Sequence, residues 1–363
     1  GAAIEAVSVV GDELLVAYIR DARAAVERFS LGGEGLGPLA LPGGGSVDGL
    51  SGRLGETEAF YSYTDFTTPR TVFRYNADTG ESVAIRRPAV AMSADDYETR
   101  QVFVRSPDGT RVPATIVARR DLPSGPRPTV LYGYGGFNVS LLPGYSTART
   151  AWLEAGGVYV VANLRGGGEY GEAWHLAGTR LNKQNVFDDF IAVAEWLVEE
   201  GVTTPRQLAI WGGSNGGLLV GAVAQQRPEL FAAAVPAVGV LDMLRYQTAS
   251  ANARQWSSDY GLSENADEFA ALYAYSPYHN LQPGTCYPAT LVMADANDDR
   301  VVPWHSYKYA AALQFAQGCD NPVLIRVETN TGHGAGASTS KIINEYADQW
   351  AFVAAKTGLK LAD

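Results

Sequence analysis

The sequence lacks several features that would assign it to common classes of protein. It has no run of about 18 uncharged apolar residues, so we expect no membrane span. Basic residues number 28 against 39 acidic ones, a net charge of −11, so nucleic acid is not an expected partner. Charged residues make up 18% of the 363 residues and hydrophobic ones 46%, which argues against disorder and allows one large domain or two.

One serine stands in a setting typical of a catalytic nucleophile. Ser214 is the centre of the run WGGSNGG at residues 211–217, between an apolar strand-like segment and an apolar helix-like one. This is the form of the G-x-S-x-G nucleophile elbow, where close approach of the backbone requires residues without a Cβ. The backbone N–H of Asn215 would lie at the N-terminus of a helix and could donate to an oxyanion.

Histidine is scarce, which limits the choice of a catalytic base to four residues. The triad of this fold follows the order serine, acid, histidine, so His175 and His279 come too early unless the topology is permuted. His305 lies where a helix begins, and we expect it to pack or cap. His333 lies in the glycine-rich run TNTGHGAG at 329–336, after an apolar strand, and is the predicted base.

The orienting acid should follow the apolar strand predicted at 289–294. Three aspartates, Asp295, Asp298 and Asp299, follow it directly, and Asp320 is a less suitable fourth candidate. A solvated turn with helix caps would explain the same residues. The local pattern does not choose between Asp298 and Asp299.

Five motifs in sequence order resemble the prolyl oligopeptidase family of serine peptidases. They are LYGYGGF at 131–137, NLRGGGEYG at 163–171, GGSNGG at 212–217, DDRVVP at 298–303 and GHGAG at 332–336. The resemblance extends from about Tyr97 to the C-terminus. It implies that the first aspartate of the DDR run is the acid, so that the triad is Ser214, Asp298 and His333.

The resemblance also implies the residues that bind substrate. The hydroxyl of Tyr134 would join the Asn215 N–H in the oxyanion hole; without the family, a packed aromatic after a strand would be the favoured explanation of Tyr134. Trp256 would stack on the substrate proline, because a rigid aromatic slot suits a flat apolar ring. The slot would be lined by Phe137, Val240, Tyr260 and Val301. Arg300 would bind a substrate backbone carbonyl; its alternative is a surface ion pair with Asp299 or Asp295.

The activity implied is a serine endopeptidase that cleaves short peptides after proline through an acyl-enzyme. Proline-containing oligopeptides would be its partners, the protein would be a monomer, and no metal or cofactor is expected. The G-x-G-x-x-G run formed by Gly166, Gly168 and Gly171 is weak evidence for a dinucleotide, since no acid ends a following strand. The alternatives are a related oligopeptidase or esterase without proline specificity, and an inactive fragment that only binds. Asn215 and Trp256 favour the prolyl-specific branch.

The predicted fold class is α/β, an α/β-hydrolase with a doubly wound, mostly parallel sheet. Residues 1–88 read as short antiparallel strands, the last blades of a β-propeller, and residues 89–363 as the catalytic domain. The chain opens without a methionine, and the resemblance implies a longer part before it. The blades are expected over the carboxyl ends of the sheet strands, above Ser214.

The two cysteines precede neighbouring strands of the predicted sheet. Cys286 and Cys319 each lie three residues before a predicted strand, and consecutive strands are often neighbours in this fold. Both thiols would then meet at one edge and form a disulfide, which would imply a periplasmic or secreted protein. The alternative is two buried free thiols in a cytoplasmic protein.

Overall fold

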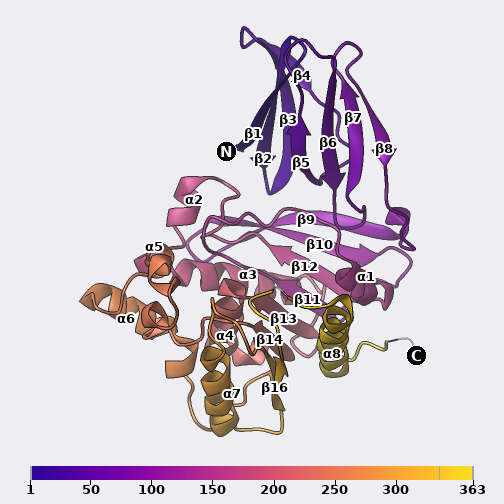
Figure 1. Ribbon diagram of the computed structural model, residues 1–363. Coiled ribbons are helices and arrows are strands. Elements are labelled where there is room, and N and C mark those ends of the chain that lie inside the picture. Colours follow the sequence, from indigo (N-terminus) through magenta and orange to yellow (C-terminus); the bar gives the residue numbers. More distant parts are fainter. Residues whose placement is uncertain (1, 335, 362–363) are drawn as a thin grey trace.

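The computed structural model describes residues 2–334 and 336–361, and begins with two small antiparallel sheets of four strands each (Figure 1). The first contains β1 (Ala2–Val10), β2 (Glu13–Arg20), β3 (Arg23–Ser30) and β4 (Gly35–Pro38), and the second β5 (Ser46–Ser51), β6 (Glu58–Thr64), β7 (Thr71–Asn76) and β8 (Glu81–Arg86). Leu15 and Val26 of one sheet share a hydrophobic cluster with Tyr61 and Tyr75 of the other. The glycine-rich segment 41–45 joins the two sheets.

An eight-stranded sheet follows, in the order β16-β15-β14-β13-β11-β12-β10-β9. Its strands are β9 (Tyr97–Arg105), β10 (Arg111–Arg119), β11 (Thr129–Tyr132), β12 (Val158–Ala162), β13 (Leu208–Gly213), β14 (Ala233–Ala237), β15 (Ala289–Asp295) and β16 (Val323–Glu328). β9 and β10 form an antiparallel hairpin at one edge, and the strands from β11 to β16 are parallel. The sheet is therefore mostly parallel, with a hairpin where strand–helix alternation was expected.

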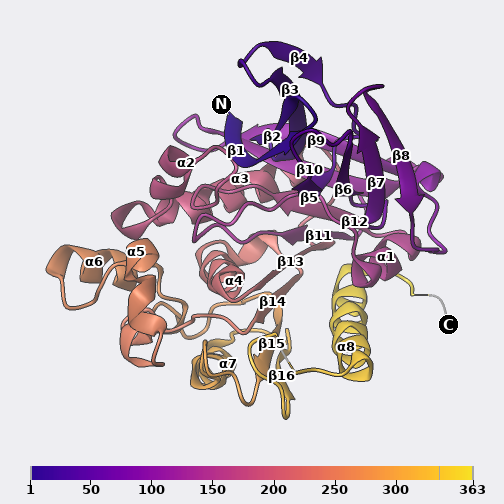
Figure 2. The ribbon, with the colours of Figure 1, turned by 45° about the horizontal axis from the view of Figure 1, so that its top comes forward.

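Helices cover both faces of this sheet (Figures 1 and 2). One face packs against α1 (Thr147–Glu154) and α8 (Thr339–Thr357), and the other against α3 (Gln184–Glu199), α4 (Asn215–Gln226) and α7 (Trp304–Ala316). Among the described residues, none of the helices has both the length and the apolar character of a membrane span.

The shorter helices lie in the connections between these elements. They are α2 (Glu172–Leu176), α5 (Ser257–Tyr260) and α6 (Ala266–Tyr275), with the 3₁₀ turns η1 (Ala94–Asp96), η2 (Arg180–Asn182), η3 (Pro228–Leu230), η4 (Tyr246–Thr248), η5 (Ala253–Trp256) and η6 (Pro277–His279). Most follow the carboxyl end of a parallel strand. They therefore supply side chains to the edge of the sheet where ligands bind in α/β folds.

The strand order reverses between β11 and β13. The chain passes from β11 to β12 on one side, then returns to β13 on the other side of β11. In such a sheet, ligands usually bind at the carboxyl ends of the strands where the order reverses. Tyr134 follows β11 and Ser214 follows β13, so the topology places both residues at this point.

The two small sheets contact the carboxyl edge of the large one. Ser46 donates a hydrogen bond to the Pro143 carbonyl at 2.6 Å, and the Tyr145 N–H donates to the Thr64 hydroxyl at 3.1 Å. Pro143 and Tyr145 lie in the loop after β11. The Tyr170 hydroxyl, in the loop after β12, donates to Asp21 at 2.7 Å. The strands before residue 88 thus lie at the edge of the sheet from which Ser214 emerges, as predicted.

A disulfide joins Cys286 and Cys319 across a sequence separation of 33 residues. The two cysteines lie just before β15 and β16, which are parallel neighbours, and a bridge between Thr285 and Gln317 continues the pairing beside them. The pairing expected from the positions of the two cysteines is present. The bond ties the amino-terminal ends of two strands whose carboxyl ends lead toward Asp298 and His333.

Removing this disulfide should lower the stability of the fold. A cross-link over a loop of this length restricts the unfolded chain and is worth about 3 kcal/mol. We expect Cys286→Ala/Cys319→Ala to lower the free energy of unfolding by ~3 kcal/mol in urea titrations. Wild type in a reducing agent should lose the same amount and the double variant none; a wild type indifferent to reduction would contradict the prediction.

Candidate active site

Ser214 occupies a strained turn between β13 and α4. Its backbone has φ +58° and ψ −117°, a conformation that side-chain-bearing residues rarely adopt. A Cβ at Gly212 would lie 2.4 Å from the Gly216 carbonyl oxygen, and one at Gly216 would lie 2.7 Å from the Gly133 carbonyl oxygen. The glycines of the run are therefore required by close backbone approach, as the elbow pattern predicts. The Ser214 N–H donates to the Ala237 carbonyl at 2.8 Å, which fixes the turn to β14.

The structure brings Ser214, His333 and Asp298 into one hydrogen-bonded series. His333 Nε2 lies 3.1 Å from the Ser214 hydroxyl, and His333 Nδ1 lies 2.6 Å from the Asp298 carboxylate. Because a carboxylate only accepts, Nδ1 carries the proton and Nε2 is free to accept from the serine. Asp299 is exposed, and Asp295 instead accepts a hydrogen bond from the Thr331 hydroxyl at 3.0 Å.

The position of Asp298 is fixed by its own loop. Its side chain is buried, and its second oxygen accepts the backbone N–H groups of Arg300 at 3.0 Å and Val301 at 2.9 Å. These bonds leave the first oxygen facing His333. Because two backbone donors hold the Asp298 carboxylate, it meets the imidazole of His333 in one fixed orientation.

Two hydrogen-bond donors lie near Ser214. Asn215 is the first residue of α4, so its backbone N–H has no acceptor within the helix. Tyr134 approaches from the loop after β11, and its hydroxyl lies near that of Ser214. Burial and the neighbouring Asp259 carboxylate raise the pKa of Tyr134, so its hydroxyl keeps the proton that a donor needs.

Aromatic and branched side chains converge beside the serine. Val240, Tyr260 and Val301 are buried in one hydrophobic cluster, and Phe137 and Trp256 pack against it half-exposed. Phe137 meets Tyr260 edge-on with ring centroids 5.3 Å apart. All five predicted pocket residues therefore lie in one cluster, of which Phe137 and Trp256 are the partly exposed members.

The side chain of Asn215 connects Tyr260 to the loop that carries Tyr134. Its amide nitrogen donates to the Tyr134 carbonyl at 2.5 Å, and its oxygen accepts from the Tyr260 hydroxyl at 2.8 Å. Tyr246, which sequence patterns did not single out, lies parallel to Trp256 with centroids 6.3 Å apart and an interplanar angle of 9°. No local signal identifies Tyr246, because its contact depends on the packing of η4 on η5.

Arg300 follows Asp298 in the loop after β15 and is exposed. Its backbone N–H donates to Asp298, and its carbonyl accepts from the Ser250 hydroxyl at 2.9 Å. Within the described part of the chain the guanidinium makes no ion pair, so the alternative of a surface pair with Asp299 or Asp295 is not found. The cationic end of Arg300 is available to an incoming acceptor.

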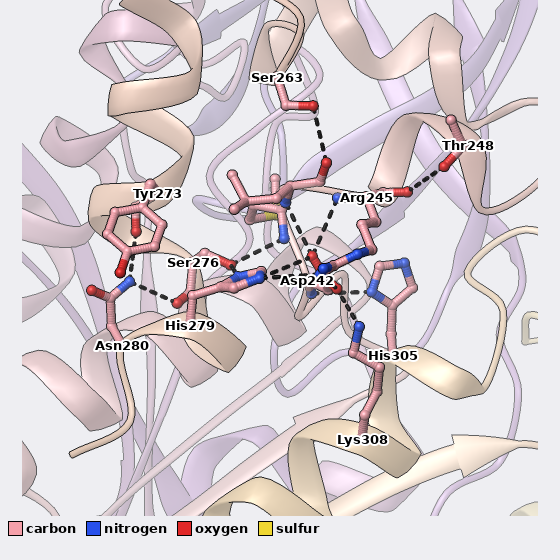
Figure 3. Close-up of polar contacts among 12 residues, drawn as sticks. Asp242, Arg245, Thr248, Ser263, Tyr273, Ser276, His279, Asn280, His305 and Lys308 are labelled. Carbon is pink, nitrogen blue, oxygen red and sulfur yellow. Dashed lines mark hydrogen bonds and ion pairs between the residues drawn. The ribbon is translucent and has the colours of Figure 1, made fainter. Parts of the chain in front are cut away.

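Two of the other histidines belong to a polar cluster around Asp242 (Figure 3). The side chain of Asp242 is buried and pairs with Lys308 and with Arg245, the latter at 3.0 Å. The Asp242 N–H donates to His305 Nδ1 at 3.1 Å, and His279 Nδ1 lies 2.8 Å from the Ser276 hydroxyl. Val240 and Asp242 lie in the same loop, and this cluster fixes that loop against α7. α7 is the helix that follows the Asp298 loop.

Both histidines of the cluster are held neutral. Burial lowers the pKa of His305 to about 3 and also lowers the pKa of His279. His305 Nδ1 is an acceptor and therefore carries no proton. His175 is separate and lies 3.3 Å from the Asp259 carboxylate. Of the four histidines, His333 alone contacts Ser214.

Fold and site together define an α/β-hydrolase, with a serine in a strand-to-helix turn at the carboxyl edge of a doubly wound sheet. Two family models match the sequence. One, described as the prolyl oligopeptidase family, matches residues 143–360, and the other, the prolyl oligopeptidase N-terminal beta-propeller domain, matches residues 1–88. The chain belongs to the prolyl oligopeptidase family, as its five motifs predicted.

Similar proteins extend over nearly the whole chain. A prolyl endopeptidase of Elizabethkingia meningoseptica is 47% identical over 352 residues, covering 96% of this chain and 50% of that protein. A solved prolyl endopeptidase structure has a TM-score of 0.94 at 46% identity, covering 99% of this chain and 53% of its own. Prolyl oligopeptidase B from Galerina marginata, bound to a 35mer hydrolysis and macrocyclization substrate, gives 0.93 at 36% identity, with 99% and 52% covered. These similarities confirm the predicted fold class. The chain spans about half the length of the curated relatives it matches.

The buried, neutral state of His305 should make the fold sensitive to acid. The folded protein resists protonation of His305 down to about pH 3, whereas the unfolded chain binds that proton near pH 6.5. The free energy of unfolding should therefore fall as pH drops from 6.5 toward 3, with a slope from this group that approaches about 1.4 kcal/mol per pH unit.

His305→Asn keeps an acceptor for the Asp242 N–H but does not titrate. Urea unfolding at pH 7, 6, 5 and 4 should give a shallower loss of stability for the variant than for wild type. Between pH 7 and 8, where His305 is neutral in both states, the difference between the two proteins should be constant. Parallel curves down to pH 4 would contradict the role given to this residue.

Proposed function

We propose that the chain is the catalytic part of a serine endopeptidase that cleaves short peptides on the carboxyl side of proline. The observation that carries the proposal is the hydrogen-bonded series from Ser214 through His333 to Asp298, placed beside a cluster that leaves Phe137 and Trp256 half-exposed. Membership of the family and the likeness to prolyl endopeptidases support it.

The proposed reaction proceeds through an acyl-enzyme. His333 Nε2 takes the Ser214 proton as the serine oxygen attacks the carbonyl carbon of the proline residue, and Asp298 stabilises the resulting imidazolium. The Asn215 N–H and the Tyr134 hydroxyl donate to the oxyanion. His333 then gives its proton to the leaving amine, and water repeats the sequence to release the acid and restore the serine.

Specificity is assigned to the aromatic slot and the rim. A proline ring presents two apolar faces and its nitrogen has no N–H, so it fits against Trp256 with Phe137 at its edge. Arg300 would donate to a carbonyl one residue upstream, a contact that does not depend on side-chain identity. Of the relatives, prolyl oligopeptidase B from Galerina marginata is described with peptide substrates, and we infer proline-containing oligopeptides for this chain.

The same proposal assigns a separate role to each of two domains along the chain. Residues 1–88 are assigned to the propeller that covers the site, and residues 89–363 to the catalytic domain. Contacts of the small sheets with the loops after β11 and β12 would then restrict access to short peptides. The disulfide supports an oxidising compartment, so we assign the protein to the periplasm or the exterior. We further propose that it acts as a monomer without a nucleic-acid partner.

Ser214 should be the single site of covalent modification. A phosphonofluoridate should label wild type with one equivalent and leave Ser214→Ala unlabelled, as measured by intact mass. His333→Ala should lower kcat for succinyl-Gly-Pro-p-nitroanilide by ~10⁴-fold, because the base is lost. Asp299→Asn, which changes an exposed neighbour of the acid, should stay within about threefold of wild type. Labelling that persists in Ser214→Ala would end the proposal.

Trp256 should govern the preference for proline. Trp256→Ala should lower kcat/KM for the Gly-Pro substrate by about 10²-fold, through loss of a buried aromatic contact, and should spare p-nitrophenyl acetate. Phe315→Ala, at an aromatic residue that is 82% exposed, is the matched control and should leave both substrates unaffected. An equal loss on both substrates would point to misfolding, and a wild type that hydrolyses only the ester would favour the esterase alternative.

A further inference from the structure

The loop that carries Tyr134 and Phe137 has an unfavourable backbone. Gly135 has φ +63°, and Phe137 and Asn138 both have φ +57°. Residues with a Cβ pay roughly 1 kcal/mol or more each in this left-handed region. Such a loop needs contacts from outside itself to keep this conformation.

Three buried side chains from distant elements supply those contacts, one to each peptide group. Asn215 donates to the Tyr134 carbonyl, as described above. Lys183 Nζ donates to the Gly135 carbonyl at 2.9 Å, and the Phe137 N–H donates to the Asp259 carboxylate at 2.5 Å. Asn215, Lys183 and Asp259 are all at least 98% buried.

Lys183 is an expensive group to bury. Within the described residues it has no carboxylate at ion-pair distance; its ammonium meets only the Gly135 carbonyl and the face of the Tyr260 ring, 5.4 Å away. Burial lowers the pKa of Lys183 to about 8, and the Asp259 charge offsets this in part. A buried lysine whose hydrogen bond goes to a loop carbonyl contributes little to stability, and its placement suggests a role in that loop.

Asp259 joins the same loop to the aromatic slot. It lies in α5 between Trp256 and Tyr260, and besides the Phe137 N–H it faces His175 Nε2 at 3.3 Å. Its carboxylate therefore fixes Phe137 relative to α5, which carries Tyr260 and directly follows Trp256. The loop thus has a cation on one of its carbonyls and an anion on one of its N–H groups.

We propose that Lys183 and Asp259 are positioning residues that clamp the 133–138 loop and so hold the Tyr134 hydroxyl at the oxyanion and Phe137 at the slot. This rests on the proposed function, because it gives Tyr134 and Phe137 the roles assigned there. Neither residue touches the reacting atoms. Loss of either clamp should let the loop relax, while the series from Ser214 to Asp298 remains in place.

The first test is a double-mutant cycle with Tyr134→Phe, read as the rate of Ser214 labelling by a phosphonofluoridate. This reagent needs the oxyanion donors but not the proline slot. Lys183→Met, which keeps length and removes the charge, should slow labelling by ~10²-fold in wild type, the cost of losing one oxyanion donor. In the Tyr134→Phe background it should slow labelling by less than about threefold. Equal losses in both backgrounds would overturn the proposal.

The second test separates positioning from general stability. Asp259→Leu removes the acceptor, whereas Asp259→Asn keeps one; labelling should fall by ~10²-fold in the first and by less than about tenfold in the second. Hydrogen exchange measured on the peptide that contains Phe137 should accelerate only in Asp259→Leu. Lys356→Met and Asp320→Asn, at exposed positions, are the matched controls and should behave as wild type.

The two proposals can fail separately. The measurements use the 363-residue chain. If the natural polypeptide has more residues than this chain, they are repeated on the complete polypeptide. A wild type that is labelled at Ser214 but does not cleave the Gly-Pro substrate would refute the proposed function, while the cycle would still report on the clamp. If Lys183→Met does not fold, the pair of Asp259 variants decides the matter: unchanged exchange at Phe137 in Asp259→Leu would refute the clamp.

Discussion

The strained backbone of Ser214 is the constraint on which the rest of the site depends. A residue with a Cβ adopts φ +58° here only because the strand before it and the helix after it are both fixed by packing. The flanking glycines let the turn approach its own helix and the Gly133 carbonyl without a clash. Every other group of the site is placed relative to this turn, from the loop after β11 to the histidine loop after β16.

Buried aspartates repeat one physical device around that turn. Asp298 accepts two backbone N–H groups of its own loop, Asp242 accepts those of Leu244 and Arg245, and Asp259 accepts one from the distant Phe137. In each case a carboxylate replaces the regular hydrogen bonds that a loop lacks. The loops at the carboxyl edge are therefore held in one conformation by hydrogen bonds, as helices and strands are, although their backbone is irregular.

The sequence singled out Ser214 and His333, which the structure brings together, and it also indicated the disulfide and the fold class, because glycine spacing, chain order and strand patterns are local signals. It did not separate Asp298 from Asp299, since both follow the same strand and only tertiary placement tells them apart; the resemblance supplied that choice. Strands β4, β5 and β8 have no clear pattern in the sequence, because they are largely exposed and show little alternation. Lys183 and Asp259 were missed because their partners are backbone groups of a loop far away in the chain.

The disulfide also limits changes in the register of β15 and β16, the two strands that precede the Asp298 and His333 loops. β15 and β16 pair from Thr290 with Val323 to Asp295 with Glu328, and the cross-link lies just before this ladder. A slip by one residue would shift one strand by about 3.3 Å and turn its side chains to the opposite face. The covalent tie excludes such a slip at the outermost strand of the sheet. The cross-link at the amino-terminal ends of β15 and β16 thus fixes their register, and with it the relative positions of Asp298 and His333 beyond their carboxyl ends.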